Sequence, residues 1–178
     1  MRIISGSRKG ARIFAPKGLD TRPTGDRTRE AAFNLIGPVD GASVLDLFAG
    51  SGAMGLEALS RGAASAVFVE RDREACRVIQ RNLEKLRLTG ADVRCQDALA
   101  ALRDERLRAR RYDLILADAP YEEWERLEGA LGELLGDVLE EGGLAVVETA
   151  AATEPQLPLD LVTTRRYGSA RITVFRTL

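Results

Sequence analysis

The stretch from Val44 to Gly55, V-L-D-L-F-A-G-S-G-A-M-G, most constrains what this chain can fold into. Apolar and β-favouring residues run directly into a glycine-rich turn, and the apolar residues after it are typical of a helix. This order predicts a strand, a tight loop and a helix N-terminus. Gly50, Gly52 and Gly55 have the G-x-G-x-x-G spacing of dinucleotide-binding loops. Glycine permits a close approach of the backbone to a ligand, and the helix N-terminus offers free N–H groups.

The spacing alone leaves two interpretations open, a cofactor loop and an ordinary strand-to-helix turn. Asp46, which lies among apolar residues four positions before Gly50, favours the cofactor loop and narrows the range of possible ligands. A carboxylate at this place repels a pyrophosphate and attracts a cation. S-adenosylmethionine carries an ammonium group and a sulfonium group, so it suits the loop better than a nicotinamide dinucleotide. A carboxylate that only braces the loop is the structural alternative.

The chain past residue 42 alternates between strand and helix patterns. We expect strands at 44–48, 66–70, 92–96, 112–117 and 144–148, with helices at 53–60, 72–88, 99–110 and 122–140. Two further strands, 161–167 and 171–176, read as a terminal hairpin that turns near Gly168. The alternation predicts a doubly wound α/β fold, with a mostly parallel seven-stranded sheet closed by an antiparallel hairpin.

Residues 1–37 read as an extension to the α/β domain at 38–178. A short hairpin is expected within residues 2–15, a rigid turn at Pro23, and a helix from about Asp26 to the Gly37-Pro38 pair. The extension has a charge of +5, residues 38–152 have −8 and residues 153–178 have +2, within a net charge of −1. Basic ends around an acidic centre predict a surface for a polyanion, with a merely solvated arginine-rich surface as the alternative.

Several classes of protein are excluded or disfavoured by composition. The chain has no histidine, which removes histidine-based triads and histidine metal sites, and we expect no metal. No apolar run approaches the roughly 20 residues of a membrane span, and the first residues lack the apolar core of a signal peptide. We therefore expect a cytoplasmic protein.

Acidic residues close the predicted parallel strands. In an open α/β sheet, ligands bind outside the carboxyl ends of the strands, where Glu70, Asp97 and Asp118 are expected to lie. Glu70 can accept hydrogen bonds from both ribose hydroxyls, and Asp97 can accept one from the adenine amino group. Any one of these acids could instead cap the following helix. Their order along the chain together with Asp46 favours cofactor binding.

The tetrapeptide Asp118-Ala119-Pro120-Tyr121 is the reactive candidate. The lone pair of an exocyclic amino group is delocalised into the base, which makes the amine a poor nucleophile. Hydrogen-bond acceptors aimed at its N–H groups localise that lone pair on the nitrogen for attack. The Asp118 carboxylate and the Ala119 carbonyl can supply these acceptors. Pro120 stiffens the turn, and Tyr121 offers a face on which the base can stack. An ordinary turn capped by Asp118 is the structural alternative.

With both motifs in view, the chain resembles the class I S-adenosylmethionine-dependent methyltransferases. More narrowly, it is similar to the bacterial 16S rRNA guanine-N2 methyltransferases, the RsmD-like family. The segments that carry the resemblance are R-I-I-S-G near the N-terminus, R-P-T-G-D-R-T-R-E-A-A-F-N at 22–34, D-L-F-A-G-S-G-A-M-G-L-E-A-L-S-R-G-A at 46–63 and D-A-P-Y at 118–121.

The resemblance implies a Rossmann-like fold and methyl transfer from S-adenosyl-L-methionine to a guanine N2 amine of 16S rRNA. It also implies that the substrate is a small ribosomal subunit or an assembly intermediate, and we expect a monomer. One departure is Ala119, where the family's motif usually reads D-P-P-Y. Alanine keeps the backbone carbonyl and loses stiffness.

Three sets of site residues follow from these interpretations. The catalytic residues are Asp118, Ala119, Pro120 and Tyr121. The cofactor-binding residues are Asp46, Phe48, Gly50, Ser51, Gly52, Glu70, Arg71, Asp97, Ala98 and Asp118. The RNA-binding residues are Arg2, Arg8, Lys9, Arg12, Arg22, Thr24, Arg27 and Arg29.

Three other functions stay open. An amino-methyltransferase acting on adenine N6 or cytosine N4 shares the chemistry of the D-x-P-Y turn. An NAD-dependent oxidoreductase is disfavoured by Asp46. A non-catalytic RNA-binding factor is disfavoured because both motifs are present.

Overall fold

The computed structural model describes residues 1–16 and 25–177. Seven strands of the described chain form one sheet in the order β3-β2-β1-β4-β5-β7-β6. The strands are β1 (Ser43–Leu47), β2 (Ser65–Glu70), β3 (Ala91–Cys95), β4 (Tyr112–Ala117), β5 (Leu139–Ala150), β6 (Asp160–Tyr167) and β7 (Ala170–Arg176). The first five run parallel, and β7 pairs antiparallel with both β5 and β6. The predicted fold class is confirmed.

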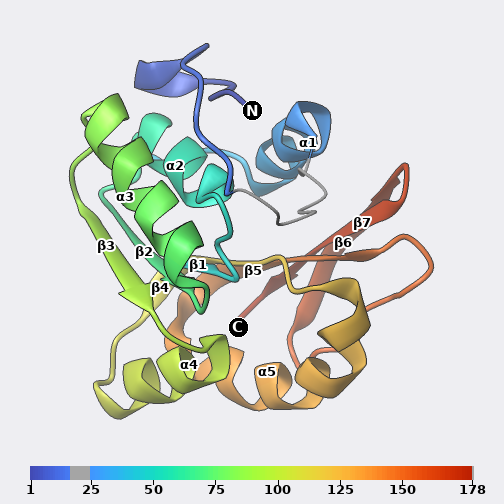
Figure 1. Cartoon of the computed structure of the whole chain (residues 1–178). Coiled ribbons are helices and arrows are strands. Elements are labelled where there is room, and N and C mark those ends of the chain that lie inside the picture. Colours follow the sequence, from blue (N-terminus) through green and yellow to red (C-terminus); the bar gives the residue numbers. More distant parts are fainter. Residues whose placement is uncertain (17–24, 178) are drawn as a thin grey trace.

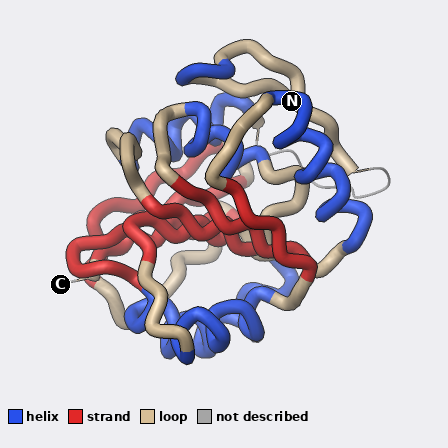
Figure 2. The backbone as a smooth tube through the Cα atoms, turned by 90° about the vertical axis from the view of Figure 1, so that its left-hand side faces the viewer, coloured by secondary structure: helices blue, strands red, loops and turns tan. Residues whose placement is uncertain are grey.

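Helices cover both faces of this sheet, so the fold has three layers (Figures 1 and 2). One face carries α1 (Asp26–Ile36), α2 (Ala53–Ser60) and α3 (Arg73–Leu86), and the other carries α4 (Ala98–Leu107) and α5 (Trp124–Val138). The short 3-10 helices η1 (Gly6–Arg8) and η2 (Tyr121–Glu123) lie before α1 and before α5. Among the helices that the structure describes, there is no candidate for a membrane span.

Strand β1 illustrates how the alternation of a strand serves two hydrophobic cores. Leu45 and Leu47 pack in the cluster that includes α4 and α5, whereas Val44 packs in the cluster of α1, α2 and α3. Side chains of a strand alternate between its two faces, so Asp46 points toward the layer that holds α2. The fold thus delivers one carboxylate to the underside of the glycine-rich turn.

Strand β5 begins earlier than the sequence indicates. The prediction placed a helix through residue 140 and a strand from 144, but α5 ends at Val138 and β5 starts at Leu139. Gly142 and Gly143, which resemble a turn in the sequence, lie inside this strand, and the register against β4 shifts before Leu144. A β-bulge tolerates glycine pairs that a sequence pattern assigns to a loop. The C-terminal hairpin turns at Gly168 as predicted.

The N-terminal segment forms a hairpin only in outline. Arg2 and Arg12 make a single antiparallel bridge, with η1 between them. Ile3, Ile13 and Phe33 belong to the same hydrophobic cluster as Val44, so this segment and α1 complete the core on one face of the sheet. The predicted turn at Pro23 lies outside the described residues.

Candidate active site

A pocket of about 1010 Å³ opens at the carboxyl ends of β1, β2 and β4. Strand β1 lies between β2 and β4 in the sheet, which makes this the topological switch point where open α/β sheets bind ligands. Every expected cofactor residue apart from Gly52 lines the pocket, and so do the four residues of the D-A-P-Y turn. The two motifs, more than sixty residues apart in the chain, therefore share one cavity.

The lining of this pocket is strongly acidic. Among the described residues it includes eight carboxylates and one basic side chain, that of Arg71. The carboxylates belong to Asp46, Glu70, Asp72, Asp97, Asp118, Glu122, Glu123 and Glu148. Arg71 forms an ion pair with Glu123 at 2.7 Å, and this hydrogen bond lowers the pKa of the Glu123 carboxyl below its usual value. Such a lining favours a cationic ligand and opposes a pyrophosphate.

The glycine-rich loop needs its glycines for two different reasons. Gly52 is the N-cap residue of α2 with a φ of 79°, a left-handed conformation that suits glycine. A Cβ on Gly55 would lie 2.4 Å from the ring of Phe68 and 3.0 Å from Asp46 Oδ2, so only glycine lets α2 pack this closely on the sheet. Phe48, which lines the pocket, has a φ of 59°, unusual for a bulky residue and typical of backbone strain stored at functional sites.

Asp46 both braces this loop and lines the pocket. Its Oδ2 accepts a hydrogen bond of 2.9 Å from the backbone N–H of Gly55, and the residue is only 3% exposed. Burial raises the pKa of Asp46 to about 7, against the opposing effect of the Gly55 hydrogen bond, and the negative charge of Glu70 raises it further. The hydrogen bond from Gly55 therefore shows that Asp46 braces the loop, as the structural alternative predicted. A cation bound beside Asp46 would favour the ionised form of this carboxyl.

Glu70 and Asp97 shape the backbone around the pocket. The two oxygens of Glu70 accept hydrogen bonds of 2.8 Å each from the N–H groups of Gly50 and Asp72. Glu70 therefore ties the glycine loop to the start of α3. Oδ1 of Asp97 accepts from Leu99 N and Ala100 N, both at 3.0 Å, which makes Asp97 the N-cap of α4. The capping alternative for Asp97 is correct, and Asp97 still lines the pocket.

The D-A-P-Y turn follows β4 directly. Ala119 is 2% exposed, and Pro120 leads into η2. The hydroxyl group of Tyr121 donates a hydrogen bond of 3.0 Å to Oε1 of Glu148, which lies near the end of β5. Sequence reasoning missed Glu148 as a site residue, although the rule that singled out Glu70 and Asp118, an acid at a strand's carboxyl end, applies to it equally.

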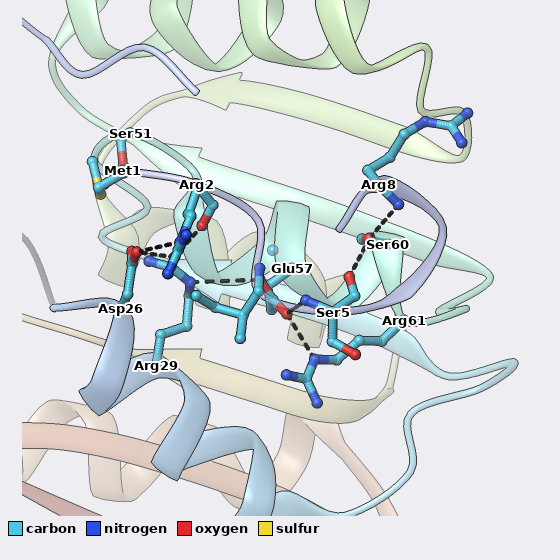
Figure 3. A network of polar contacts seen from close by, with 12 residues as sticks. Met1, Arg2, Ser5, Arg8, Asp26, Arg29, Ser51, Glu57, Ser60 and Arg61 are labelled. Carbon is cyan, nitrogen blue, oxygen red and sulfur yellow. Dashed lines mark hydrogen bonds and ion pairs between the residues drawn. The ribbon is translucent and has the colours of Figure 1, made fainter. Parts of the chain in front are cut away.

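The structure corrects the assignment of Arg29 to RNA binding. The side chain of Arg29 is fully buried (Figure 3). Its Nη2 lies 3.0 Å from Asp26 Oδ1 and also donates a hydrogen bond to the Arg2 carbonyl. Its Nε lies 3.6 Å from Oε2 of Glu57, within ion-pair range and beyond hydrogen-bond range. A guanidinium without solvent access has no route to a phosphate, so this expectation was wrong. A charge count along the sequence cannot separate buried arginines from exposed ones.

Glu57 of α2 is the anchor of this network. It is fully buried and accepts hydrogen bonds from the backbone N–H groups of Ile4 at 2.8 Å and Ser5 at 2.9 Å. Arg61 donates to it at 2.8 Å, one helical turn away. The N-terminal segment is thereby held on α2, and Met1 reaches the lining of the pocket.

The other predicted RNA contacts divide into tethered and exposed side chains. Arg8 donates to the carbonyls of Leu86 and Arg87 at the end of α3, and Arg2 pairs with Asp26 at 3.1 Å. Lys9, Arg12 and Arg27 are exposed, as an RNA contact requires. Arg22 and Thr24 lie outside the described residues.

Comparisons with known proteins agree with this geometry. The family described as "Conserved hypothetical protein 95" matches residues 1–176. YlbH of Bacillus subtilis, by its name an rRNA methyltransferase, is 43% identical over 99% of this chain and 98% of its own length. The Ribosomal RNA small subunit methyltransferase D of Escherichia coli is 35% identical over 92% of this chain and 78% of its own.

A solved structure extends the likeness to three dimensions. A hypothetical protein of Thermus thermophilus has a TM-score of 0.85 and 33% sequence identity, and the match covers 98% of each chain. The chain therefore belongs to the Conserved hypothetical protein 95 family, the RsmD-like family of S-adenosylmethionine-dependent methyltransferases.

Proposed function

We propose that this protein transfers a methyl group from S-adenosyl-L-methionine to the exocyclic N2 amine of a guanine in 16S ribosomal RNA. One observation carries the proposal: the glycine loop, the buried Asp46 and the D-A-P-Y turn line a single acidic pocket at the switch point of the sheet. The curated relatives named for methylation of small-subunit rRNA support the choice of RNA.

The residues of the pocket fit the cofactor. Its electrophilic methyl group is carried on a sulfonium, so the molecule brings positive charge into a pocket of carboxylates. Asp46 would hold the ammonium end, and ionisation of its carboxyl becomes favourable when that charge is present. Glu70 would accept hydrogen bonds from the ribose, and the Asp97–Ala98 turn would border the adenine.

The chemistry at the nitrogen rests on Asp118 and Ala119. A guanine N2 amine is a weak nucleophile because its lone pair is shared with the ring. When the Asp118 carboxylate and the Ala119 carbonyl accept hydrogen bonds from its two N–H groups, the lone pair would be localised on the nitrogen and available for attack on the methyl group that the cofactor would supply. The acceptors act on charge that develops in the transition state, and removal of one such polar group costs about 10²–10³ in rate.

Tyr121 would hold the base in place for this step. Its ring supplies a stacking face, and its hydrogen bond to Glu148 restricts the orientation of that ring. Proton removal before attack is unnecessary, because the amine has a lone pair. The N–C bond would form as the bond between the cofactor's sulfur and the methyl group breaks, and the extra proton of the methylated amine would then pass to water.

The substrate would be a small ribosomal subunit or an intermediate in its assembly, bound by a monomer. Exposed cations of the extension 1–37 would contact its phosphates, namely Lys9, Arg12, Arg27 and Arg2. Phosphate contacts give affinity without sequence choice, so guanine selection falls to the pocket.

The test is nucleoside mass spectrometry of rRNA. A strain in which the gene is deleted should lack one N2-methylguanosine in 16S rRNA, and complementation should restore it. The Asp118→Ala variant, expressed at the same level, should not restore it. Loss of a methylated adenine or cytosine in place of guanine would transfer the activity to one of the other amino groups. Unchanged 16S rRNA would refute the proposal.

A further inference from the structure

A row of positive charges lies on the exposed side of α3, outside the pocket. Arg73, Arg77, Arg81 and Lys85 are exposed and spaced four residues apart, which places them along one side of the helix. Arg87, also exposed, follows as the C-cap. These residues belong to the stretch 38–152 that has a net charge of −8, so counting charge by sequence segment conceals them.

Two of these cations converge on one aromatic ring of the N-terminal segment. Arg81 Cζ lies 4.6 Å and Lys85 Nζ 4.5 Å from the centroid of Phe14, which is itself 39% exposed. The two charges are therefore separated by no more than the sum of these two distances to the ring centroid. That separation is comparable to the Debye length of about 8 Å at physiological ionic strength. They repel each other, and an anion bound between them would remove that repulsion.

The exposed cations near Phe14 form no ion pairs in the described part of the chain, although Glu84 lies on the same helix. Among the residues that the structure describes, no ion pair involves Lys9, Arg12, Arg81, Lys85 or Arg87, whereas Arg77 pairs with Glu74 at 3.4 Å. Cations in the last turn of a helix stabilise its dipole, which accounts for Lys85. That effect does not account for Arg81, one turn earlier, or for the cations of the N-terminal segment.

Buried hydrogen bonds fix Phe14 against α3. The side chain of Asn82, fully buried, accepts from Phe14 N at 2.7 Å and donates to the Phe14 carbonyl at 3.0 Å. The same amide nitrogen donates to the carbonyl of Ser51 at 3.2 Å, and Ser51 belongs to the glycine loop of the pocket. Asn82 therefore joins the aromatic platform to the edge of the site, and Figure 1 shows α3 beside the N-terminal segment.

We propose that this Phe14 surface binds phosphates of the RNA substrate and leads the strand to the pocket. It comprises Lys9, Arg12, Phe14, Arg81, Lys85 and Arg87. The inference rests on the proposed function, because an acidic pocket repels a phosphate backbone and nearby cations must overcome that repulsion. The part of this surface that runs from Arg81 to Arg87 covers about 9 Å of helix, the length of about two to three phosphates of a stacked strand.

The test compares two double variants that each remove two positive charges. Arg81→Gln with Lys85→Gln alters the Phe14 surface. Arg103→Gln with Arg108→Gln is the matched control, because both are exposed residues of the α4 region on the other face of the sheet. Binding of a 16S rRNA transcript is measured across a salt series, and binding of S-adenosylmethionine is measured beside it.

The first variant should lower the slope of log K against log salt by about 1.4, since each lost contact to a single strand contributes about 0.7. At 0.1 M salt this corresponds to an affinity about 25-fold weaker, with cofactor binding unchanged. The control variant should match the wild type. Equal losses in both variants, or no loss in the first, overturn the inference.

A third variant separates the ring from the charges. Phe14→Leu keeps an apolar side chain and removes no charge, so it should weaken RNA binding by about two- to fivefold without a change in the salt slope. A change in slope would contradict the proposed role of the ring. The proposed function would be refuted separately, if the wild type methylated neither the transcript nor small subunits. Equal RNA binding by the wild type and the variants would instead refute only the role of the Phe14 surface.

Discussion

The pocket and the Phe14 surface are built from adjoining elements and have opposite charge. The pocket contains eight carboxylates and one guanidinium among its described residues, whereas the Phe14 surface combines five exposed cations with one aromatic ring, and two of the five, Arg81 and Lys85, lie against that ring. The net charge of −1 hides this separation. A cationic cofactor and a polyanionic substrate need opposite electrostatic environments within one enzyme. On our proposal, the fold divides the two tasks between the carboxyl edge of the sheet, which takes the cofactor, and the outside of α3, which takes the RNA.

Arg29 shows that a positive charge in the basic extension is not always available to bind RNA. It belongs by sequence to the basic extension, yet it is fully buried among Asp26, Glu57 and the Arg2 carbonyl. A buried cation holds the segment in place, and only an exposed cation can meet a phosphate. The largest predicted effect follows from this distinction.

Arg29→Met should destabilise the fold by about 3–5 kcal/mol, because the change removes the charged hydrogen bonds to Asp26 and to the Arg2 carbonyl and leaves the buried Glu57 carboxylate with Arg61 as its remaining cation. For a chain of this size the melting temperature should fall by roughly 6–20 °C. Arg27→Met, an exposed neighbour on the same helix, should stay within about 0.5 kcal/mol of the wild type. Calorimetry measures both. Below its melting temperature the Arg29 variant should keep the wild-type salt slope for RNA binding, and a shallower slope would return Arg29 to the RNA-binding set.

Asp118→Ala tests the chemical end of the acidic pocket. Turnover should fall by about 10²–10³-fold, because one acceptor for the developing charge on the amine is removed. Affinity for the cofactor should change far less. Asp118→Asn should retain more activity than Asp118→Ala, since its amide oxygen still accepts a hydrogen bond. Single-turnover rates and equilibrium binding separate the two quantities, and wild-type turnover by the alanine variant would end the assignment.

The raised pKa of Asp46 predicts a pH dependence of cofactor binding. The carboxyl is increasingly protonated below its pKa of about 7, and only the carboxylate attracts the ammonium group. Affinity for S-adenosylmethionine should therefore fall by about tenfold for each pH unit below that value and level off above it. Titration calorimetry between pH 5.5 and 8.5 measures this. Asp46→Asn, whose amide oxygen can still accept from Gly55 N, should show no such dependence.

The stability of the ligand-free protein should show the opposite trend. Because the folded pKa of Asp46 exceeds the usual 3.8, the folded state binds more protons than the unfolded state between about pH 4 and 7. The contribution of this group to stability should thus decrease as the pH rises through that window, by up to about 1.4 kcal/mol per pH unit, and stay constant above it. Denaturant midpoints of wild type and Asp46→Asn at matched pH isolate the effect. A difference that does not vary with pH would contradict the raised pKa.

Ala119→Pro should have the smallest effect. Proline keeps the carbonyl that serves as acceptor and restricts the unfolded chain, which stabilises a protein by about 0.4–1 kcal/mol where the backbone conformation suits it. We expect unchanged or moderately higher turnover and a melting temperature about 1–4 °C higher. A large loss of turnover would show that the turn depends on the N–H group of Ala119.

The sequence by itself determined the order of strands and helices and the residues of both motifs. Apolar periodicity reports local burial, so α2 and β4 have their predicted bounds and the other parallel strands up to β3 lie within one residue of theirs. The glycine spacing and the acids at strand ends identified Asp46, Glu70, Asp97 and Asp118 as pocket residues, because parallel strands bring their carboxyl ends to one edge.

Only the tertiary structure decided which charged side chains are exposed, which are buried and which partners they have. Asp97 caps α4, Arg29 is buried against Glu57, and Glu148 reaches Tyr121 from a neighbouring strand. The cations of α3 meet Phe14 because Asn82 fastens a segment 68 residues away. Electrostatic effects depend on distance and solvent access in space, and a linear count of charges contains neither.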